Sequence, residues 1–447
     1  MTEMMKNSEQ SRRKKVQWFL ARLAAVEVGE TRVLFWSFSY FFALLCSYYI
    51  IRPVRDEMGI AGGVDKLQWL FSGTLLVMLA MVPLFGWVTK RFPVRRFLPY
   101  VYYFFIADLI LFFILFKSDV AHAYVARGFF IWVSVFNLFI VSVFWSLMAD
   151  IFESEQAKRL FGIIAAGGTA GALTGPVLTA VLVKAMGTAN MLMISAGFLA
   201  AAVFCIHRII AWKNSTDISF GGGAPAAKRN ADSDQAIGGG ILAGIRLVFS
   251  SSYLAGICLL ILLYTTLATF LYLQQAQIVR DSFADPARRT ALFAAIDFSV
   301  NFLTLLTQLL ATSRIVSKVG LNWTLALIPL LLGIGFILLG MMPALGIMIA
   351  VQILRRAGNY AVMRPAREML YVVLGKEEKY KAKNFIDTVV YRGGDALSAW
   401  VYTGLKAMGL SLASIAFAAV PLAGVWAWIA FRLGKRQTAL AKQQKII

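Results

Sequence analysis

Charged side chains within long apolar segments are the residues of this sequence best placed to do chemistry. A charge at bilayer depth costs at least about 2.5 to 3.5 kcal/mol, so it persists only when it is paired or faces a cavity. Arginine presents a planar fork that suits a phosphate or carboxylate, and a neighbouring tyrosine offers a face on which a base or ring can stack. We therefore predict a substrate-binding site that contains Arg127, Asn137, Arg355, Arg356, Asn359, Tyr360, Asp387, Tyr391, Arg392 and Asp395.

Helical spacing places several of these residues on two faces. Arg355 and Asn359 are four residues apart, and Asp387, Tyr391 and Asp395 follow one another at the same spacing. Residues four apart lie on one side of a helix, so each set is expected to share a face. The same charges also fit a structural alternative, in which they form interhelical salt bridges such as Arg355 with Asp387.

Charged clusters of a second kind mark the ends of apolar segments. Pro53 lacks a backbone donor and clashes with the preceding turn, so we expect it to break the helix of the first span at its extracytoplasmic end. The alternative to a gating role for such clusters is a solvated helix end with snorkelling arginines. We predict an outer gate of Arg52, Arg55, Asp56 and Glu57 opposite Arg280 and Asp281, and an inner gate of Arg364, Arg367 and Glu368.

Composition indicates that membrane-spanning helices carry these residues. Hydrophobic residues make up 59% of the 447, and the mean hydropathy is +0.71. The apolar residues form blocks of about twenty, the length that crosses roughly 30 Å of hydrocarbon, whereas barrel strands are only about ten residues long and alternate in polarity. We predict an all-α membrane protein with twelve transmembrane helices near residues 33–51, 67–88, 97–116, 124–149, 160–183, 189–210, 254–275, 290–312, 322–341, 344–363, 383–405 and 409–432.

Basic residues indicate how the chain crosses the membrane. With both termini in the cytoplasm, most of the 44 Lys and Arg fall in cytoplasmic loops and tails, which is the positive-inside pattern. The net charge of +21 then reflects topology and attraction to anionic lipid head groups. Because the basic residues are spread over many loops rather than gathered on one domain, they argue against nucleic-acid binding.

A polar, glycine-rich stretch at 213–240 predicts a flexible cytoplasmic linker between two six-helix bundles, 33–212 and 241–432. At an offset of 225, Arg55-Asp56 matches Arg280-Asp281 and Gly168 matches Gly393, so the halves read as pseudo-repeats. Six plus six spans form the major-facilitator plan, in which the substrate binds between parallel repeats. Residues 1–32, with an amphipathic helix at 16–23, and residues 433–447 are expected to be basic cytoplasmic tails.

The remaining motifs do not indicate catalysis. The glycine-rich run at 161–176 lies inside an apolar segment with no preceding strand and no Gly-Lys-Ser ending, so it predicts close helix packing rather than a phosphate loop. The three cysteines lie in or beside apolar segments and predict neither a disulfide framework nor a metal site. Since the sequence has no spacing typical of a nucleophile and its base, we expect no enzyme activity and no cofactor.

Residues 367–387 resemble a family signature. The run REMLYVVLGKEEKYKAKNFID, followed by Arg392, is similar to the second-half motif of the ATP:ADP antiporters, the nucleotide translocases of plastids and obligate intracellular bacteria. Arg55-Asp56 resembles that family's charged cluster after the first span. The resemblance implies exchange of ATP for ADP, or of related nucleotides, by alternating access. Asp395 departs from the motif, which usually has a lysine there. The charged positions that correspond to the motif are Lys381, Lys383, Asp387 and Arg392.

Two functions stay open. The first is antiport of nucleotides or of another phosphorylated anion; the second is proton-coupled transport or export of a different solute, with Asp108, Asp297 or Asp387 as the titrating site. A membrane scaffold or sensor fits less well, because embedded charges in two matched halves would then be costly without purpose. We expect a monomer in the inner membrane of a bacterium, with an anionic small molecule and the surrounding lipids as its partners.

Overall fold

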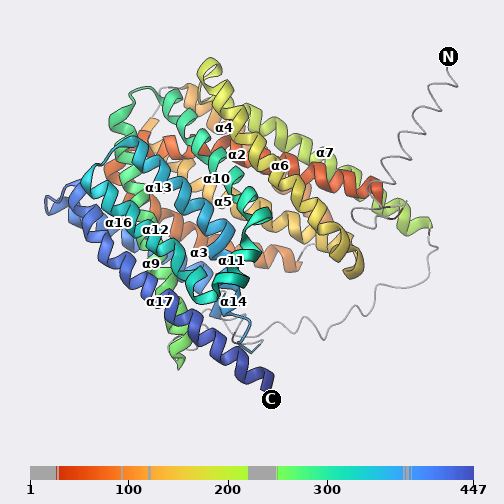
Figure 1. The fold of residues 1–447 in the computed structure, drawn as a ribbon. Coiled ribbons are helices and arrows are strands. Elements are labelled where there is room, and N and C mark those ends of the chain that lie inside the picture. Colours follow the sequence, from red (N-terminus) through yellow and green to blue (C-terminus); the bar gives the residue numbers. More distant parts are fainter. Residues whose placement is uncertain are drawn as a thin grey trace, which may run out of the picture. The chain divides into compact units, whose positions relative to one another are not determined.

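The computed structural model describes residues 27, 30–91, 94–118, 122–219, 248, 250–375, 378, 382–383 and 385–446. Within these residues the regular secondary structure is helical throughout (Figure 1). The predicted amphipathic helix at 16–23, most of the predicted linker and Lys381 lie outside them.

The helices follow the predicted order. In the first half of the chain they are α2 (Thr31–Ala61), the short η1 (Val64–Lys66), α3 (Leu67–Arg91), α4 (Val94–Lys117), α5 (His122–Ile151), α6 (Ser154–Met186) and α7 (Asn190–Ser219). In the second half they are α9 (Ser252–Ser282), α10 (Pro286–Leu310), α11 (Thr312–Val319), α12 (Leu321–Met341), α13 (Leu345–Gly358), η2 (Asn359–Met363), α14 (Arg364–Leu370), η3 (Ile386–Val390), α16 (Tyr391–Ala407) and α17 (Leu412–Ile446). Helix α17 therefore continues through most of the predicted basic tail.

Ten of the described helices are long and apolar enough to cross a membrane. The tenth and eleventh predicted spans correspond instead to two composite helices, α13–η2–α14 and η3–α16, each of which contains a π-helical turn. The π turns divide these spans into shorter α-helical pieces. Both composite helices carry residues of the predicted binding site.

Pro53 does not end the first helix. Helix α2 runs without interruption from Thr31 to Ala61, with Pro53 inside it, so the predicted break at this position is wrong. A proline removes one backbone hydrogen bond, and packed neighbours in a membrane bundle tolerate that loss. The charged residues that follow Pro53 are therefore held on a continuous helix.

Packing divides the described chain into two compact units. The first comprises the described residues within Met1–Pro53, Leu84–Asp119 and Phe136–Pro225; the second comprises those within Val54–Pro83, Val120–Val135 and Ala226–Ile447. In the first unit α7 packs against α4 and α6. In the second, α9 packs against α16 and α17, α12 packs against α17, and α10 packs against α13.

A glycine seam joins α6 to α2 in the first unit. A Cβ on Gly167 would lie 2.5 Å from the Phe38 carbonyl oxygen, and one on Gly175 would lie 2.8 Å from the Cys46 carbonyl oxygen. Gly171, between them, approaches the α2 backbone in the same way. Small residues at four-residue spacing let two helix backbones come into contact, so the predicted packing role of the run at 161–176 is confirmed.

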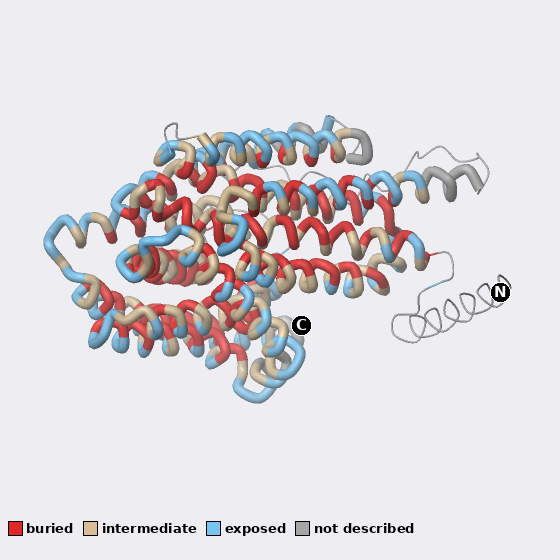
Figure 2. The backbone as a smooth tube through the Cα atoms, turned by 90° about the horizontal axis from the view of Figure 1, so that it is seen from above, coloured by how far each residue is buried: buried red, intermediate tan, exposed pale blue. Residues whose placement is uncertain are grey.

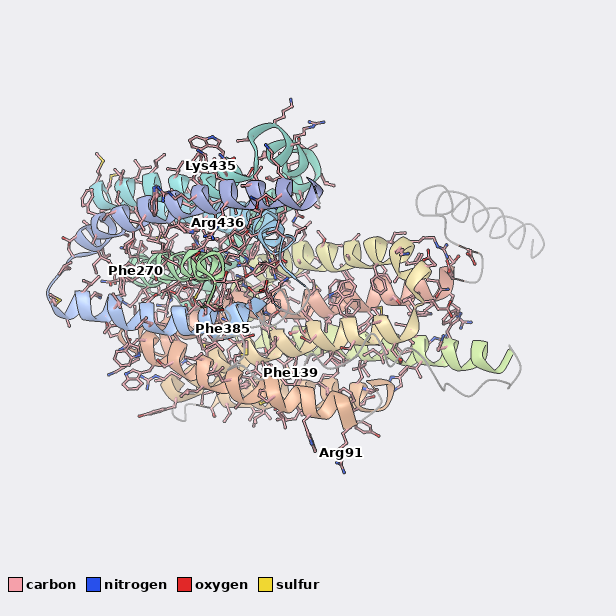
Figure 3. All side chains as sticks on the ribbon, turned by 90° about the horizontal axis from the view of Figure 1, so that it is seen from below. Arg91, Phe139, Phe270, Phe385, Lys435 and Arg436 are labelled. Atoms are coloured by element: carbon pink, nitrogen blue, oxygen red, sulfur yellow. The ribbon has the colours of Figure 1, made fainter. Side chains whose placement is uncertain are left out.

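Large side chains fill the interior of the second unit, where Trp426 and Phe336 are fully buried. Phe270 of α9, which is labelled in Figure 3, is 2% exposed. Along most helices in Figure 2, buried stretches alternate with exposed ones, so each helix has an inner and an outer face. The outer faces carry exposed apolar side chains such as Leu309 and Trp428. Such apolar outer surfaces are expected where lipid tails cover the protein.

Candidate functional site

Three arginines gather around one carboxylate in the second unit. Arg392 and Asp395 lie one turn apart on α16, and Arg392 Nη1 is 3.6 Å from Asp395 Oδ2. Arg355 of α13 and Arg55 of α2 also attract the Asp395 carboxylate electrostatically, and Thr269 of α9 donates a hydrogen bond to it at 3.3 Å. We call Arg55, Arg355, Arg392 and Asp395 the arginine cluster; it joins residues from both halves of the sequence.

Aromatic rings surround this cluster. The Arg392 guanidinium lies 5.6 Å from the Tyr391 ring centroid, and Tyr391 in turn contacts Tyr264, with 5.9 Å between the ring centroids. The Arg55 guanidinium lies only 3.9 Å from the Phe130 centroid, and its Nε donates to the Phe130 carbonyl at 3.3 Å. Cation–π contacts of this kind hold a guanidinium flat while leaving some of its N–H groups available.

The two arginines at the end of α13 have different environments. Arg355 Nε donates to Gln352 Oε1 at 3.0 Å, and Gln352 donates to Gln275 of α9. Arg356 Nη2 lies 2.6 Å from Asp297 Oδ1 on α10, and their side chains are only 9% and 1% exposed. Asp297, predicted as a coupling site, and Arg356, predicted to bind substrate, thus form a buried interhelical salt bridge.

Asp387 and Asp395 have different partners. Asp387 lies in the π-helical turn η3, and its Oδ1 is 3.5 Å from Arg367 Nη2, whereas Asp395 lies near Arg392 on α16. A π turn closes i→i+5 hydrogen bonds and so contains one more residue than an α turn. That Asp387, Tyr391 and Asp395 share one helix face stays a prediction.

Other predicted binding residues lie elsewhere. Asn359 and Tyr360 lie in η2. Arg127 of α5 donates to the Gly62 carbonyl at 2.8 Å, which ties α5 to the end of α2 within the second unit. Asn137 and Asp108 are half-buried on α5 and α4 in the first unit.

A compact group of four charges links α14 to η3. Lys383 Nζ lies 2.5 Å from Glu368 Oε2, and Arg367 Nη2 lies 3.5 Å from Asp387 Oδ1. Burial raises the pKa of the adjacent Tyr371 well above its ordinary range, so this residue stays a neutral phenol. We call Arg367, Glu368, Lys383 and Asp387 the Glu368 cluster; all four belong to the second half of the sequence.

A buried salt bridge connects α2 to α10. Arg289 Nε lies 2.9 Å from Glu57 Oε2, with the Glu57 side chain fully buried and that of Arg289 11% exposed. Glu57 was among the predicted gate residues, but Arg289 was not. Arg289 lies three residues after Pro286, which begins α10. In the sequence this position resembles a solvated helix end.

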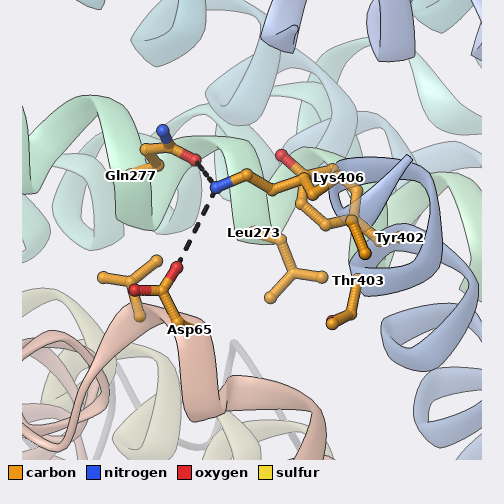
Figure 4. Close-up of a pocket in the computed structure, with 8 residues that line it drawn as sticks. Asp65, Leu273, Gln277, Tyr402, Thr403 and Lys406 are labelled. Atoms are coloured by element: carbon orange, nitrogen blue, oxygen red, sulfur yellow. Dashed lines mark hydrogen bonds and ion pairs between the residues drawn. The ribbon is translucent and has the colours of Figure 1, made fainter. Parts of the chain in front are cut away.

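The short η1 lies against α9 and close to the end of α16. Asp65 carboxylate oxygens lie 3.9 Å from Arg280 Nη1 and 4.0 Å from Lys406 Nζ, while Lys406 also donates to Gln277 at 2.7 Å (Figure 4). Arg280 Nε in addition contacts Asp281 at 3.1 Å. We call Asp65, Arg280, Asp281 and Lys406 the Asp65 cluster. It borders a pocket of about 310 Å³ that is also lined by Val64, Leu273, Tyr402 and Thr403.

The remaining predicted gate residues are partly involved in these contacts. Asp56 accepts a hydrogen bond from Tyr272 of α9 at 3.1 Å, whereas Arg280, predicted to oppose it, is part of the Asp65 cluster. Arg52 lies beside the Tyr49 ring, 5.6 Å from its centroid. Arg364 is exposed.

Comparison with known families shows the family to which this chain belongs. Residues 129–436 match the family model described as TLC ATP/ADP transporter. The matched range contains the helices of the second half as far as residue 436 of α17 and most of the arginine cluster. The chain belongs to the TLC ATP/ADP transporter family. It is therefore a membrane transporter and not an enzyme, and the resemblance seen in its sequence is confirmed.

Curated relatives of this TLC family member are distant in sequence. ADP,ATP carrier protein 1 of Chlamydia muridarum is 22% identical over 489 aligned positions, which cover 94% of this chain and 92% of the relative. ADP,ATP carrier protein 1 of Chlamydia trachomatis is 24% identical over 341 positions, which cover 68% and 64%.

Solved structures share the fold of this TLC family member at low identity. A bacterial homologue of the iron transporter ferroportin aligns with a TM-score of 0.63 at 12% identity, over 91% of this chain and all of the other. A nucleoside transporter aligns with a TM-score of 0.60 at 12% identity, over 91% and 99%. A POT family transporter aligns with a TM-score of 0.59 at 13% identity, over 91% and 96%. The chain is thus a multi-pass membrane protein with a major-facilitator-like fold, as predicted.

Proposed function

We propose that this chain exchanges nucleotides of the ATP/ADP type, or a closely related phosphorylated anion, across a membrane by alternating access. The arginine cluster is the observation that carries the proposal. It offers three guanidinium groups with one carboxylate among them, beside the rings of Tyr391 and Tyr264. The membership of the chain in the TLC ATP/ADP transporter family supports the same substrate class.

The chemistry of the cluster suits such a substrate. A guanidinium binds phosphate oxygens through two parallel N–H donors, and a hydrogen bond to a charged group contributes about 1.5 to 3 kcal/mol. An aromatic ring contributes about 1 to 3 kcal/mol when a base stacks on it. Arg392, which lies over Tyr391, can therefore bind a phosphate beside a ring that holds the base.

Alternating access requires that each mouth of the transporter open in turn. We assign the outer gate to the Glu57–Arg289 salt bridge and the Asp65 cluster, because both join first-half residues to second-half residues. The Glu368 cluster joins only second-half residues. We assign it a role at the inner mouth, where it fixes α14 against η3.

The topology follows from the distribution of basic residues. We place both termini and the Glu368 cluster on the cytoplasmic side of a bacterial inner membrane, and the Asp65 cluster on the opposite side. The positive-inside pattern of the loops supports this orientation, and the bacterial relatives support the membrane.

The decisive experiment is transport by purified protein in proteoliposomes. Uptake of labelled ADP and ATP should require an internal nucleotide, and neutral solutes should neither enter nor compete. Arg392→Gln should abolish most of this exchange. Arg432→Gln is the matched control, because Arg432 also lies over an aromatic ring, that of Trp428 at 4.4 Å, but on α17.

The same assay addresses the second candidate function, proton-coupled transport of a different solute. Asp395 favours this candidate, because it places a carboxylate inside the proposed site. Uptake that is driven by a pH gradient and does not depend on internal nucleotide would contradict nucleotide exchange and support the proton-coupled mechanism.

A further inference from the structure

The Asp395 carboxylate lies among the cations that the proposed site offers to an anionic ligand. The Asp395 side chain is 13% exposed and lies 3.6 Å from Arg392. It accepts a hydrogen bond from Thr269, and Arg55 and Arg355 attract it as well. A phosphate that binds these arginines must therefore share them with a negative charge that the protein itself supplies.

A count of charges shows what this sharing does. The cluster holds the three cations Arg55, Arg355 and Arg392 against Asp395, and Arg55 also lies 3.3 Å from Asp56. The group of five therefore carries one net positive charge. Arg355 contacts a neutral amide, that of Gln352, so it has the least compensated charge of the three.

We infer that Asp395 determines specificity by limiting how many negative charges the site accepts. The inference rests on the proposed function and narrows it, since Asp395 repels each further charge on the substrate and so favours less highly charged phosphates over triphosphates. A negative charge on the ligand that lies about 10 Å from Asp395, at an effective dielectric constant near 20, is repelled strongly enough to lower the affinity roughly tenfold. Each additional negative charge on the ligand therefore lowers its affinity for the unmodified protein but not for the neutral Asp395→Asn variant.

Inorganic anions of increasing charge test this inference without any transport. Binding of phosphate, pyrophosphate and tripolyphosphate to the purified protein is measured by titration calorimetry. In Asp395→Asn, the preference for tripolyphosphate over phosphate should increase roughly tenfold or more relative to the unmodified protein. Glu155→Gln is the matched control, since Glu155 is 81% exposed on α6 and belongs to none of the proposed binding or gating clusters, and it should leave the preference unchanged.

Two further variants separate charge from structure. Asp395→Glu keeps the charge and should keep the original preference. Asp395→Ser removes the charge and should shift the preference in the same way as Asp395→Asn, so it replaces the asparagine variant if that variant does not fold. An unchanged preference in both neutral variants overturns the inference, as does the absence of anion binding in all proteins. A melting temperature that falls without any change in preference would show that Asp395 serves only as a structural partner of Arg392.

Failure of the proposed function has a different signature. If the unmodified protein does not exchange nucleotides in proteoliposomes but Asp395→Asn still shifts the anion preference, the site binds phosphorylated anions of another kind. If nucleotides are exchanged and the preference does not shift, the transport proposal stands and the role of Asp395 is rejected.

Discussion

Removal of Arg289 should open the proposed outer gate at the Glu57–Arg289 salt bridge. The Glu57 side chain is fully buried and Arg289 lies 2.9 Å from it, so Arg289→Gln leaves a buried carboxylate without its cation. Loss of one partner of a buried pair costs about 3 to 5 kcal/mol. A conformation in which Glu57 reaches water avoids that cost, and the variant should shift toward it.

Protonation limits the size of this shift. A carboxyl with an ordinary pKa of about 4.3 requires about 3.7 kcal/mol to become neutral at pH 7, because each pH unit contributes about 1.36 kcal/mol. The closed conformation of Arg289→Gln is therefore destabilised by at most about 3.7 kcal/mol at pH 7, which is roughly a 500-fold change in the equilibrium constant. At pH 5 the same limit is about 1 kcal/mol, or roughly fivefold.

Thiol labelling measures the opening. Ile60, one turn after Glu57 on α2, is 5% exposed, and Ile60→Cys in a background without the native cysteines reports access to this region in detergent-purified protein. The labelling rate of Arg289→Gln relative to its parent should rise by up to roughly 500-fold at pH 7 and by far less at pH 5. Taking the ratio at each pH removes the effect of thiol ionisation on the rate.

Two controls accompany the labelling experiment. Arg288→Gln removes a neighbouring charge that is 70% exposed and should not alter the rate. Adding Glu57→Gln to Arg289→Gln removes the unpaired charge and should restore slow labelling. The gate assignment is refuted if Arg289→Gln lowers the melting temperature while labelling of Ile60→Cys stays slow at both pH values.

Three further predictions concern other parts of the molecule. Arg392→Gln should weaken the apparent nucleotide affinity in competition assays by roughly ten- to a hundredfold, and Arg392→Lys should recover only part because a point charge does not reproduce the planar fork; equal recovery by lysine would contradict bidentate binding. Lys383→Gln should lower the free energy of unfolding by less than about 1 kcal/mol, because the Lys383 side chain is one-third exposed. Arg367→Gln should lower the free energy of unfolding several-fold more, since the Arg367 side chain is only 10% exposed. Equal effects of the two variants in scanning calorimetry would contradict this prediction. Gly171→Ala should cost about 1 to 3 kcal/mol by forcing a methyl group against the α2 backbone, while Gly197→Ala meets open space and should be neutral or stabilising.

Hydropathy was sufficient to predict the order of the helices, because the length of an apolar segment reflects the thickness of the bilayer. The same signal placed the end of the first span near residue 51, whereas α2 continues to Ala61. The last ten residues of α2 include Arg52, Arg55, Asp56 and Glu57, whose charges lower the local hydropathy. Hydropathy reports the solvent that a segment prefers and not where its backbone hydrogen bonds end.

The sequence identified some residues of the candidate site and missed others. Arg355, Arg392 and Asp395 were identified because charges within apolar segments are costly and therefore few. The two π turns were not foreseen, since no residue type marks them. Arg289 was missed because burial of a charge at a helix end depends on which other helix packs there.

The direction of Arg392 depends on whether the turn at η3 is π-helical or α-helical. An α-helix advances about 100° and 1.5 Å per residue, so closing this turn as a regular α-helical turn, with no change of sequence, would turn everything after it by about that angle. Such a conversion would carry Arg392 and Asp395 together away from Arg55 and Arg355. Deleting a single residue between Ile386 and Val390 would instead remove the surplus residue of the π turn and leave both side chains in nearly the same direction on an α-helical α16.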